Sequence, residues 1–387
     1  MRGADGKPIA VGYEGTRSRR FSFPAAICLL WMICLKKVLK MPVLTIQQII
    51  QQLVDGQDVL PDDLIGVLST TDPESVAALY AAADRKRREM VGDAVLLRGI
   101  IEISNICDQN CQYCGLRKDN RRIHRYRMPA EEIVAAAQKI SQSDISTVVL
   151  QSGEDRMPVD QIYTIVARIK RETDLFVTLS LGERSDEDYR RFKAAGADRY
   201  LLKHETSSRV LFEKLRPGSS YENRRRCLEC LQDLGFETGA GNLIGLPGQN
   251  VTDLAADLLY LRTLQPDMIG IGPFIPHPET PLADCPPGSS DMTLKVISLA
   301  RLFIPQANIP ATTALGVLDK SGRISALKSG ANVVMLDFTP ETYRQYYDIY
   351  PGKAQVITEM DQYLTHLKQE LAAIGRTAGR DAALTNK

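Results

Sequence analysis

The sequence lacks an excess of charge of either sign. Lys and Arg total 48 against 47 Asp and Glu, so the formal net charge is +1 over 387 residues. A chain this neutral has no overall field to attract nucleic acid or an anionic membrane, and we expect neither as a partner. Apolar residues at 44% and charged residues at 25% are typical of one large globular core with appendages. Small-molecule chemistry is therefore favoured.

Cysteine is also scarce for a chain of this length. Eight cysteines are too few for a disulfide scaffold, and three of them, Cys107, Cys111 and Cys114, lie close together. That spacing favours metal binding over disulfide pairing. We therefore expect a reducing, cytoplasmic location.

A run long and apolar enough to span a bilayer is missing too. The nearest candidate, residues 23–35, has basic residues on both sides and resembles a signal sequence. At about 13 residues it falls short of the roughly 20 that a membrane span needs, and no small-residue cleavage site follows it. We expect residues 1–40 to be a disordered or mis-assigned extension.

Organised sequence begins at Met41. Thr45 and Gln48 form a capping box ahead of an apolar helical pattern, and Thr71 and Glu74 predict a second box that opens a helix toward Met90. Residues 41–94 are therefore predicted to form an N-terminal helical cap.

Strand and helix patterns alternate from residue 95 onward. Helical patterns at 130–141 and 252–264 lie between short β-branched or apolar runs, and 359–374 predicts a closing helix. The runs predict eight strands, at 96–104, 147–151, 175–181, 199–203, 237–243, 268–272, 310–314 and 332–336. Alternation of this kind predicts an α/β fold, a (βα)8 TIM-type barrel over 95–350 with a C-terminal closing segment over 351–387. A doubly wound open sheet is the alternative.

The cysteine loop follows the first predicted strand directly. Barrel active sites are built at that end of the strands. Three thiolates spaced C-x3-C-x2-C can hold three irons of a 4Fe–4S cubane and leave the fourth iron without a protein ligand. Such an iron can take the amino and carboxylate groups of S-adenosylmethionine (SAM), and the reduced cluster can then break a carbon–sulfur bond. The motif therefore indicates radical SAM chemistry.

A structural zinc site is the alternative interpretation of this loop. It would need a fourth ligand, for which His124 is the nearest candidate in sequence. Cys227 and Cys230 form a C-x2-C pair inside a helical pattern, and without a second pair they are interpreted as packed thiols.

Short segments at predicted strand ends carry a family resemblance. They are EISN (102–105), CGLR (114–117), RYRM (125–128), LQSGED (150–155), TLSLGE (178–183), RYLLKHET (199–206), TGAG (238–241), GLPGQ (245–249), GIGPFIPHP (270–278) and IPATT (309–313). From about residue 45 to 379 the chain resembles the HydE family, the radical SAM maturases of FeFe-hydrogenase, within the biotin-synthase-like branch.

The resemblance implies a set of site residues. Cys107, Cys111 and Cys114 would bind the cluster, and Tyr113 would lie beside the adenine of SAM. The other positions that match SAM-binding residues are Gln151, Thr178, Ser180, Glu205 and Arg224. Those that match the substrate or anion region are Lys203, Met268, Thr312, Thr313, Met335, Tyr347 and Tyr350. For each polar residue the alternative is solvation of a strand end, and for the methionines it is barrel core.

Two departures from the family pattern bear on cofactor and substrate. Some members carry a second iron–sulfur site on three cysteines, and Gln355, Tyr363 and His366 stand at the corresponding positions, so one 4Fe–4S cluster is expected. Lys203 stands where the family commonly has Arg, and the two side chains differ in how they bind carboxylates.

The resemblance also implies a reaction. SAM would be cleaved reductively to a 5′-deoxyadenosyl radical that attacks a sulfur-containing, iron-bound cysteine substrate during maturation of the hydrogenase cluster. Other hydrogenase maturation proteins would be partners, and a ferredoxin or flavodoxin would supply the electron. A basic stretch could dock such an acidic donor: Arg117, Lys118, Arg121, Arg122, Arg125 and Arg127. The alternatives are another enzyme of the branch, with sulfur insertion or amino-acid rearrangement, and a non-catalytic iron–sulfur carrier.

Overall fold

The structure is a computed structural model that describes residues 44–353 and 360–381. The chain divides into a unit of residues 1–44 and a unit of residues 45–387, and the fold described here is that of the second unit. The predicted extension 1–40 and the position of Gln355 lie outside the described residues. None of the described helices is long and apolar enough to cross a membrane.

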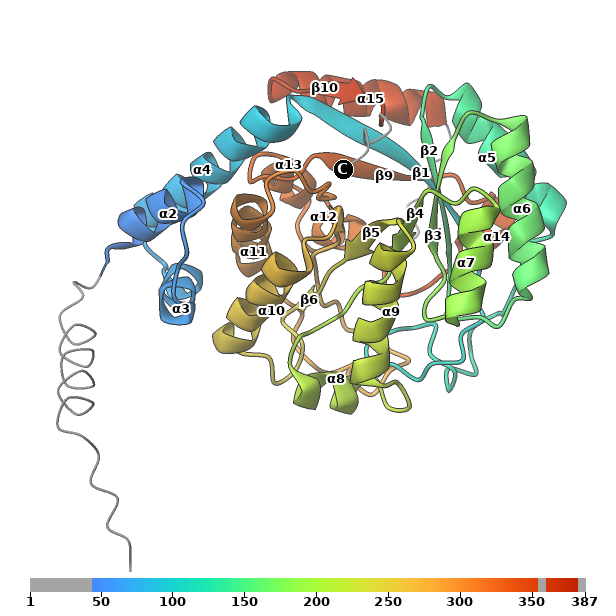
Figure 1. The fold of residues 1–387 in the computed structure, drawn as a ribbon, viewed down its shortest axis with the longest axis horizontal. Helices are drawn as coiled ribbons and strands as arrows, with labels where there is room; N and C mark the ends of the chain where they lie inside the picture. The colour runs from blue at the N-terminus through green and yellow to red at the C-terminus, as the bar shows by residue number, and fades with distance from the viewer. Residues whose placement is uncertain (1–43, 354–359, 382–387) are drawn as a thin grey trace, which may run out of the picture. The chain divides into compact units, whose positions relative to one another are not determined.

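A parallel eight-stranded sheet curls into a barrel with helices on its outside (Figure 1). Its order is β10-β1-β2-β3-β4-β5-β7, and β9 pairs with the other edge of β1. The strands are β1 (Ala94–Ser104), β2 (Thr147–Ser152), β3 (Phe176–Ser180), β4 (Arg199–Leu201), β5 (Glu237–Ala240), β7 (Met268–Ile269), β9 (Val333–Asp337) and β10 (Thr377–Gly379). The predicted α/β barrel is confirmed, and the open doubly wound sheet is wrong.

The predicted seventh strand at 310–314 is wrong in extent. Single parallel bridges, Met268 with Asn308 and Pro310 with Val333, connect β7 to β9 through this segment. Pro310 has no N–H to donate, and the chain turns at Thr312 into α12 (Thr313–Leu318). Residues 308–311 therefore close the barrel without forming a strand.

Two other predicted strands break in two. The run 237–243 becomes β5 and β6 (Leu243–Ile244), and 268–272 becomes β7 and β8 (Gly272–Pro273), with β6 paired to β8 in a separate sheet. A Cβ on Gly241 would lie 2.1 Å from the carbonyl oxygen of Gly270. The backbones approach this closely only because Gly241 has no side chain.

Amphipathic helices cover the outer face of the sheet. In α6, buried Ile162, Ile165, Val166 and Ile169 recur at helical spacing and face the strands. The covering helices are α5 (Ala130–Gln142), α6 (Val159–Glu172), α7 (Asp186–Ala194), α8 (Arg209–Leu215), α9 (Tyr221–Asp233), α10 (Val251–Leu264), α11 (Ser290–Phe303) and α13 (Gly322–Leu327). The short α14 (Glu341–Arg344) and α15 (Met360–Ala373) follow β9.

Three helices precede the barrel, α2 (Ile46–Val54), α3 (Pro61–Ser69) and α4 (Pro73–Val91). The capping box of Thr45 and Gln48 is confirmed. The predicted box of Thr71 and Glu74 is wrong, because Asp72 caps α4 by accepting from the Ser75 N–H, with Pro73 in the first turn. The helix itself ends near the predicted residue.

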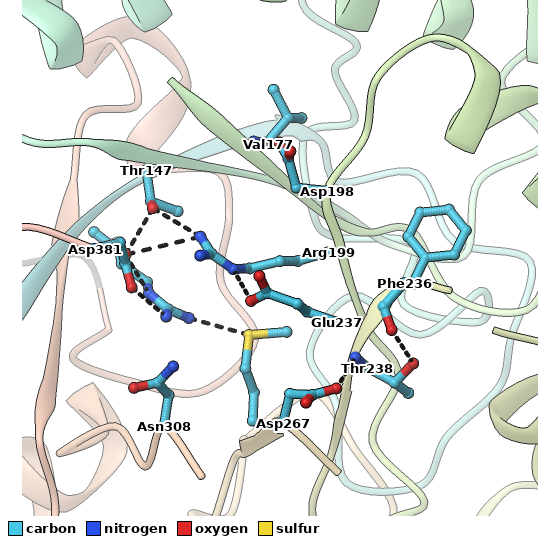
Figure 2. Close-up of polar contacts among 12 residues, drawn as sticks. Thr147, Val177, Asp198, Arg199, Phe236, Glu237, Thr238, Asp267, Asn308 and Asp381 are labelled. Atoms are coloured by element: carbon cyan, nitrogen blue, oxygen red, sulfur yellow. Dashed lines mark hydrogen bonds and ion pairs between the residues drawn. The ribbon is translucent and has the colours of Figure 1, made fainter. Parts of the chain in front are cut away.

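The C-terminal segment does more than add a closing helix. After α15, β10 pairs with the beginning of β1, which the sequence did not predict. The following Asp381 carboxylate accepts from Arg98 at 2.8 and 3.0 Å and from the Thr147 hydroxyl at 2.6 Å. Arg199 lies 3.8 Å from Asp381 and also pairs with Glu237 (Figure 2). This set of five side chains, the bottom network, fills the amino-terminal end of the barrel.

Candidate active site

A cavity of about 360 Å³ lies at the carboxyl-terminal end of the strands. Alternate residues of a strand share one face, so residues that are paired in register point into the barrel together. Much of the predicted site lines this cavity: Tyr113, Cys114, Gln151, Lys203, Glu205, Thr312, Thr313, Met335 and Tyr350. The structure therefore brings together side chains from the cluster loop, from several strand ends and from the segment after α14.

The cysteine loop is tied to its surroundings by its backbone. The N–H of Asp108 donates to the Glu154 carbonyl at 3.0 Å, and the N–H of Gln112 donates to the Leu215 carbonyl at 2.9 Å. A Cβ on Gly153 would lie 2.3 Å from the Ile106 carbonyl oxygen. The loop therefore sits directly on the end of β2, and only glycine allows that approach.

Arg125 fixes the loop from the other side. Its guanidinium donates to four carbonyls, those of Asn105, Leu116, Arg117 and Asn120. The sequence analysis placed Arg125 in a basic docking stretch, but the structure shows that its guanidinium makes hydrogen bonds within the loop. Arg127 is likewise paired, with Asp155 at 2.6 Å.

The chemistry of the three thiols suits a cluster. Burial, together with the neighbouring Cys111 thiol, raises the pKa of Cys107 to about 11. The pKa of Cys114 is raised by burial and by both other thiols, so the three side chains lie near one another. The irons of a 4Fe–4S cluster held by Cys107, Cys111 and Cys114 would stabilise the three thiolates and offset their mutual repulsion. The residues present therefore fit a 4Fe–4S cluster.

No single-ion site accompanies this loop. Among the described residues, no group of three or more His, Cys, Asp or Glu side chains is arranged to hold one metal ion. The ring of His124, the candidate fourth zinc ligand, packs on Tyr346 with 4.5 Å between centroids. Cys227 is buried in α9, and its thiol contacts the Arg184 carbonyl, as expected for a packed thiol.

A buried chain of charges leads away from the loop. Arg216 donates to the Tyr113 hydroxyl at 3.1 Å and to Glu154 at 2.7 Å, and Arg224 donates to the same Glu154 oxygen at 2.6 Å. Arg224 also lies 2.8 Å from Glu183. Burial alone would raise the pKa of Glu154, but the Arg224 and Arg216 guanidiniums lower it to about 2. Glu154 therefore stays ionised and orients both arginines.

Glu205 adopts a left-handed backbone conformation, with φ of 66°. Its N–H donates to the Gly241 carbonyl and its own carbonyl accepts from Leu243, which holds this uncommon geometry. The carboxylate lies 3.7 Å from Lys203 and 4.0 Å from Arg216. Strain at a cavity residue of this kind is typical of functional sites.

The remaining predicted SAM positions lie on adjacent strands. Gln151 and Ser180 are paired in register, and the Gln151 amide donates to the Tyr347 hydroxyl at 3.0 Å. Thr178 lies one layer deeper, and its buried hydroxyl has no hydrogen-bond partner among the described residues. Tyr347 is buried beneath the cavity rather than part of its lining.

Met268 is placed differently from the expectation. Its sulfur lies 3.0 Å from the Arg98 guanidinium beside the bottom network, and it does not line the cavity. The barrel-core alternative therefore describes Met268 better than a substrate contact, whereas Met335 does line the cavity.

The sequence missed four charged residues of the cavity lining: Glu102, Arg323, Asp337 and Lys353. Glu102 and Asp337 are paired in register with Gln151 and Ile100, so strand alternation would have pointed them inward. Burial lowers the pKa of Lys353 to about 7. Strand or helix periodicity could not place Lys353 in the site, because it lies in an irregular segment.

Comparison with known proteins defines the class first. The radical SAM superfamily profile matches residues 101–261, which run from the last residues of β1 through the cysteine loop to most of α10. The chain is a radical SAM enzyme, and that superfamily implies a 4Fe–4S cluster and SAM.

The particular family follows from a closer relative. The chain is 51% identical over 316 residues to the [FeFe] hydrogenase maturase subunit HydE of Thermotoga maritima, covering 81% of this chain and 90% of that protein. The chain therefore belongs to the HydE family. It is also 29% identical to the 3-methylornithine synthase of Methanosarcina acetivorans, covering 73% of this chain and 81% of that one.

Solved structures agree on the fold. Methylornithine synthase (PylB) matches with a TM-score of 0.76 and 26% identity over 86% of this chain and 97% of that chain. The FeFe-hydrogenase maturase HydG from Carboxydothermus hydrogenoformans matches with a TM-score of 0.71 and 20% identity over 87% and 80% of the two chains, and at that identity it supports the fold alone.

Proposed function

We propose that this enzyme acts in maturation of the FeFe-hydrogenase active-site cluster, on a sulfur-containing, iron-bound cysteine substrate. The observation that carries the proposal is the 51% identity to a HydE maturase along most of both chains. The cavity supports it, because the Cys114 thiol, Lys203 and the polar side chains matched to SAM binding, Gln151 and Glu205, line one cavity.

Each residue then has a role in the reaction. Cys107, Cys111 and Cys114 hold one 4Fe–4S cluster, which with SAM supplies the 5′-deoxyadenosyl radical. Tyr113, oriented by Arg216, lies beside the adenine. The side chains that bind the rest of SAM are Gln151, Thr178, Ser180, Glu205 and Arg224. Lys203, Thr312 and Thr313 bind the anionic part of the substrate, and Met335 and Tyr350 pack around it and exclude water. Tyr347 supports the cavity from beneath by accepting from the Gln151 amide.

The proposal extends to partners and place. A ferredoxin or flavodoxin supplies the electron and docks on the exposed Lys118 and Arg121 beside the loop, since Arg125 and Arg127 are engaged internally. Other maturation proteins use the product. A cytoplasmic location keeps the cluster thiols reduced.

The test is reconstitution with and without a hydrogenase. Anaerobic protein with dithionite and SAM should yield 5′-deoxyadenosine, and adding it to an extract that lacks its own HydE should restore hydrogenase activity. SAM cleavage without restoration would favour an amino-acid rearrangement, for which the likeness to methylornithine synthase is the specific observation. Failure to cleave SAM would favour an iron–sulfur carrier.

A further inference from the structure

Glu102 is a buried acid that faces the cavity from β1. Its side chain is fully buried and belongs to the lining of the cavity. Its backbone N–H donates to the Thr339 hydroxyl at 3.0 Å, which fixes the end of the strand. A carboxylate withdrawn from water in this way is costly unless donors surround it.

The donors around Glu102 are incomplete. The Lys353 ammonium contacts one carboxylate oxygen, Oε1. The other oxygen, Oε2, is buried and has no hydrogen-bond donor among the described residues. A buried acceptor without a hydrogen-bond donor indicates a missing ligand, because most buried acceptors in folded proteins accept a hydrogen bond.

The charged side chains near Glu102 also have partners other than Glu102. Asp337 accepts from the Thr339 N–H at 2.9 Å and lies 3.7 Å from Arg344. Arg323 donates to the Tyr363 hydroxyl. Lys353 lies between the two acids, 3.6 Å from Asp337, with the Tyr347 ring 4.9 Å away. Lys353 is therefore held in place as the counter-ion of Glu102 and Asp337, which form one wall of the cavity.

The opposite wall of the cavity carries a basic side chain instead of acidic ones. Following the sheet order, β4 lies across the barrel from β9, so Lys203 at the end of β4 faces the wall of Asp337 and Glu102. Thr312, on the same cavity, has a buried hydroxyl without a hydrogen-bond partner in the described part of the chain. A cation with hydroxyls suits a carboxylate.

We propose that Glu102 is a recognition residue for the protonated amine of an α-amino-acid substrate, whose carboxylate lies toward Lys203 and Thr312. The inference rests on the proposed function, because it names the amino-acid part of the substrate in the same cavity. Glu102 Oε2 accepts from the ammonium, and Lys353 keeps Oε1 neutralised and the carboxylate aimed. The cavity is thereby selective for a zwitterion over either ion alone.

Two probes that differ only in the amine test the proposal. S-methyl-L-cysteine and 3-(methylthio)propanoate share a carboxylate and a thioether, and each is titrated calorimetrically into the anaerobic, cluster-loaded protein with SAM. The wild type should bind the amine-bearing probe about tenfold to a hundredfold more tightly, the usual effect of a hydrogen bond to a charged group. Glu102→Gln should reduce that preference to within about threefold.

Matched variants give the result its meaning. Lys203→Gln should weaken both probes together, and Glu187→Gln, on the exposed surface of α7, should change neither. If Glu102→Gln fails to load iron, Glu102→Asp, which withdraws the charge by one methylene, should still lower the preference. Equal loss of both probes in the Glu102 variants, no preference in the wild type, or no binding of either probe would overturn the proposal. The titration needs no turnover, so a protein that discriminates the probes without cleaving SAM would refute the proposed function alone.

Discussion

The two ends of the barrel treat buried charge in opposite ways. In the bottom network, Arg98, Thr147, Arg199, Glu237 and Asp381 bond to one another. Among the described residues, none of the buried side-chain polar atoms without a hydrogen-bond partner belongs to that network. At the carboxyl-terminal end such atoms recur, on Glu102, Thr178 and Thr312.

This difference separates structural charge from functional charge. A buried ion pair stabilises a fold only when its partners are complete, and the bottom network meets that condition. Buried polar groups without hydrogen-bond partners, as at the other end, destabilise the free protein. A ligand that supplies those partners stabilises the protein when it binds. The polar groups at both ends of the barrel are buried, and the two ends therefore differ in whether those groups have complete hydrogen-bond partners.

Removing the thiols should have the largest effect. Replacing Cys107, Cys111 and Cys114 together by Ala removes every expected cluster ligand, so iron should fall from about four per chain to near zero and 5′-deoxyadenosine formation should stop. Replacing Cys227, Cys230 and Cys285 together is the control and should leave iron content unchanged. An iron–sulfur signal that survives the first triple replacement would show that a second cluster exists.

Breaking the bottom network should have the next largest effect. Asp381→Ala leaves Arg98 without its counter-ion and should lower the free energy of unfolding by about 3–5 kcal/mol in denaturant titrations near pH 7. Asp144→Asn removes the charge of an exposed pair with Arg380, keeps a side chain that tolerates the left-handed backbone at that position, and should cost under about 1 kcal/mol. Similar losses in the two variants would remove the distinction between structural and surface charge at this end.

The same variant predicts a pH dependence. Burial alone would raise the pKa of Asp381, but the Arg98 guanidinium lowers it below its ordinary value. A lowered carboxyl pKa stabilises the fold above about pH 4 and loses that contribution as the pH falls through the folded-state value. The stability gap between wild type and Asp381→Ala should therefore shrink as the pH falls below about 4.

A change at the open end should affect binding more than folding. Glu205→Gln should weaken SAM by about 1–3 kcal/mol in equilibrium dialysis, the usual cost of a lost charged hydrogen bond, and barely change the unfolding free energy. Arg224→Ala should weaken SAM and also destabilise the fold, because Glu154 loses a buried partner. SAM affinity that is unchanged in both variants would contradict the assignment.

The smallest effect is expected outside the barrel. A chain that starts at Met41 keeps both ends of the barrel, so its iron content and melting temperature should match those of the full chain. The measurement is a direct comparison of the two proteins after anaerobic purification. A loss of iron in the shorter protein alone would show that residues 1–40 contribute to the barrel.

The fold and the cluster loop could be predicted from local patterns in the sequence. Apolar runs with intervening helical periodicity predicted the barrel, and the cysteine spacing predicted the cluster loop. The resemblance of the strand-end segments to the HydE family implied Gln151, Lys203 and Glu205. The sequence could not predict contacts set by tertiary packing. Arg216 reaches Tyr113 from the end of α8, and Lys353 reaches Glu102 from an irregular segment, so neither has a periodic signal.

Strand limits failed for a related reason. At 310–314 a β-favouring composition competes with Pro310 and with the start of α12, and the missing N–H prevails. Strand β10 is only three residues long, and its pairing with β1 depends on α15 delivering it there. Such short elements carry too little pattern to be recognised alone.

The bond between Arg98 and Asp381 also sets an order of events during synthesis. The two residues are 283 positions apart, so the network cannot form until the chain has been synthesised as far as Asp381. Arg98 and Arg199 therefore lack the Asp381 carboxylate while the strands that precede it are being synthesised. Contacts of such long sequence separation form slowly, because the loop must close before the contact repays it. Closure of the barrel floor is accordingly a late event in the life of each nascent molecule, later than emergence of the cysteine loop.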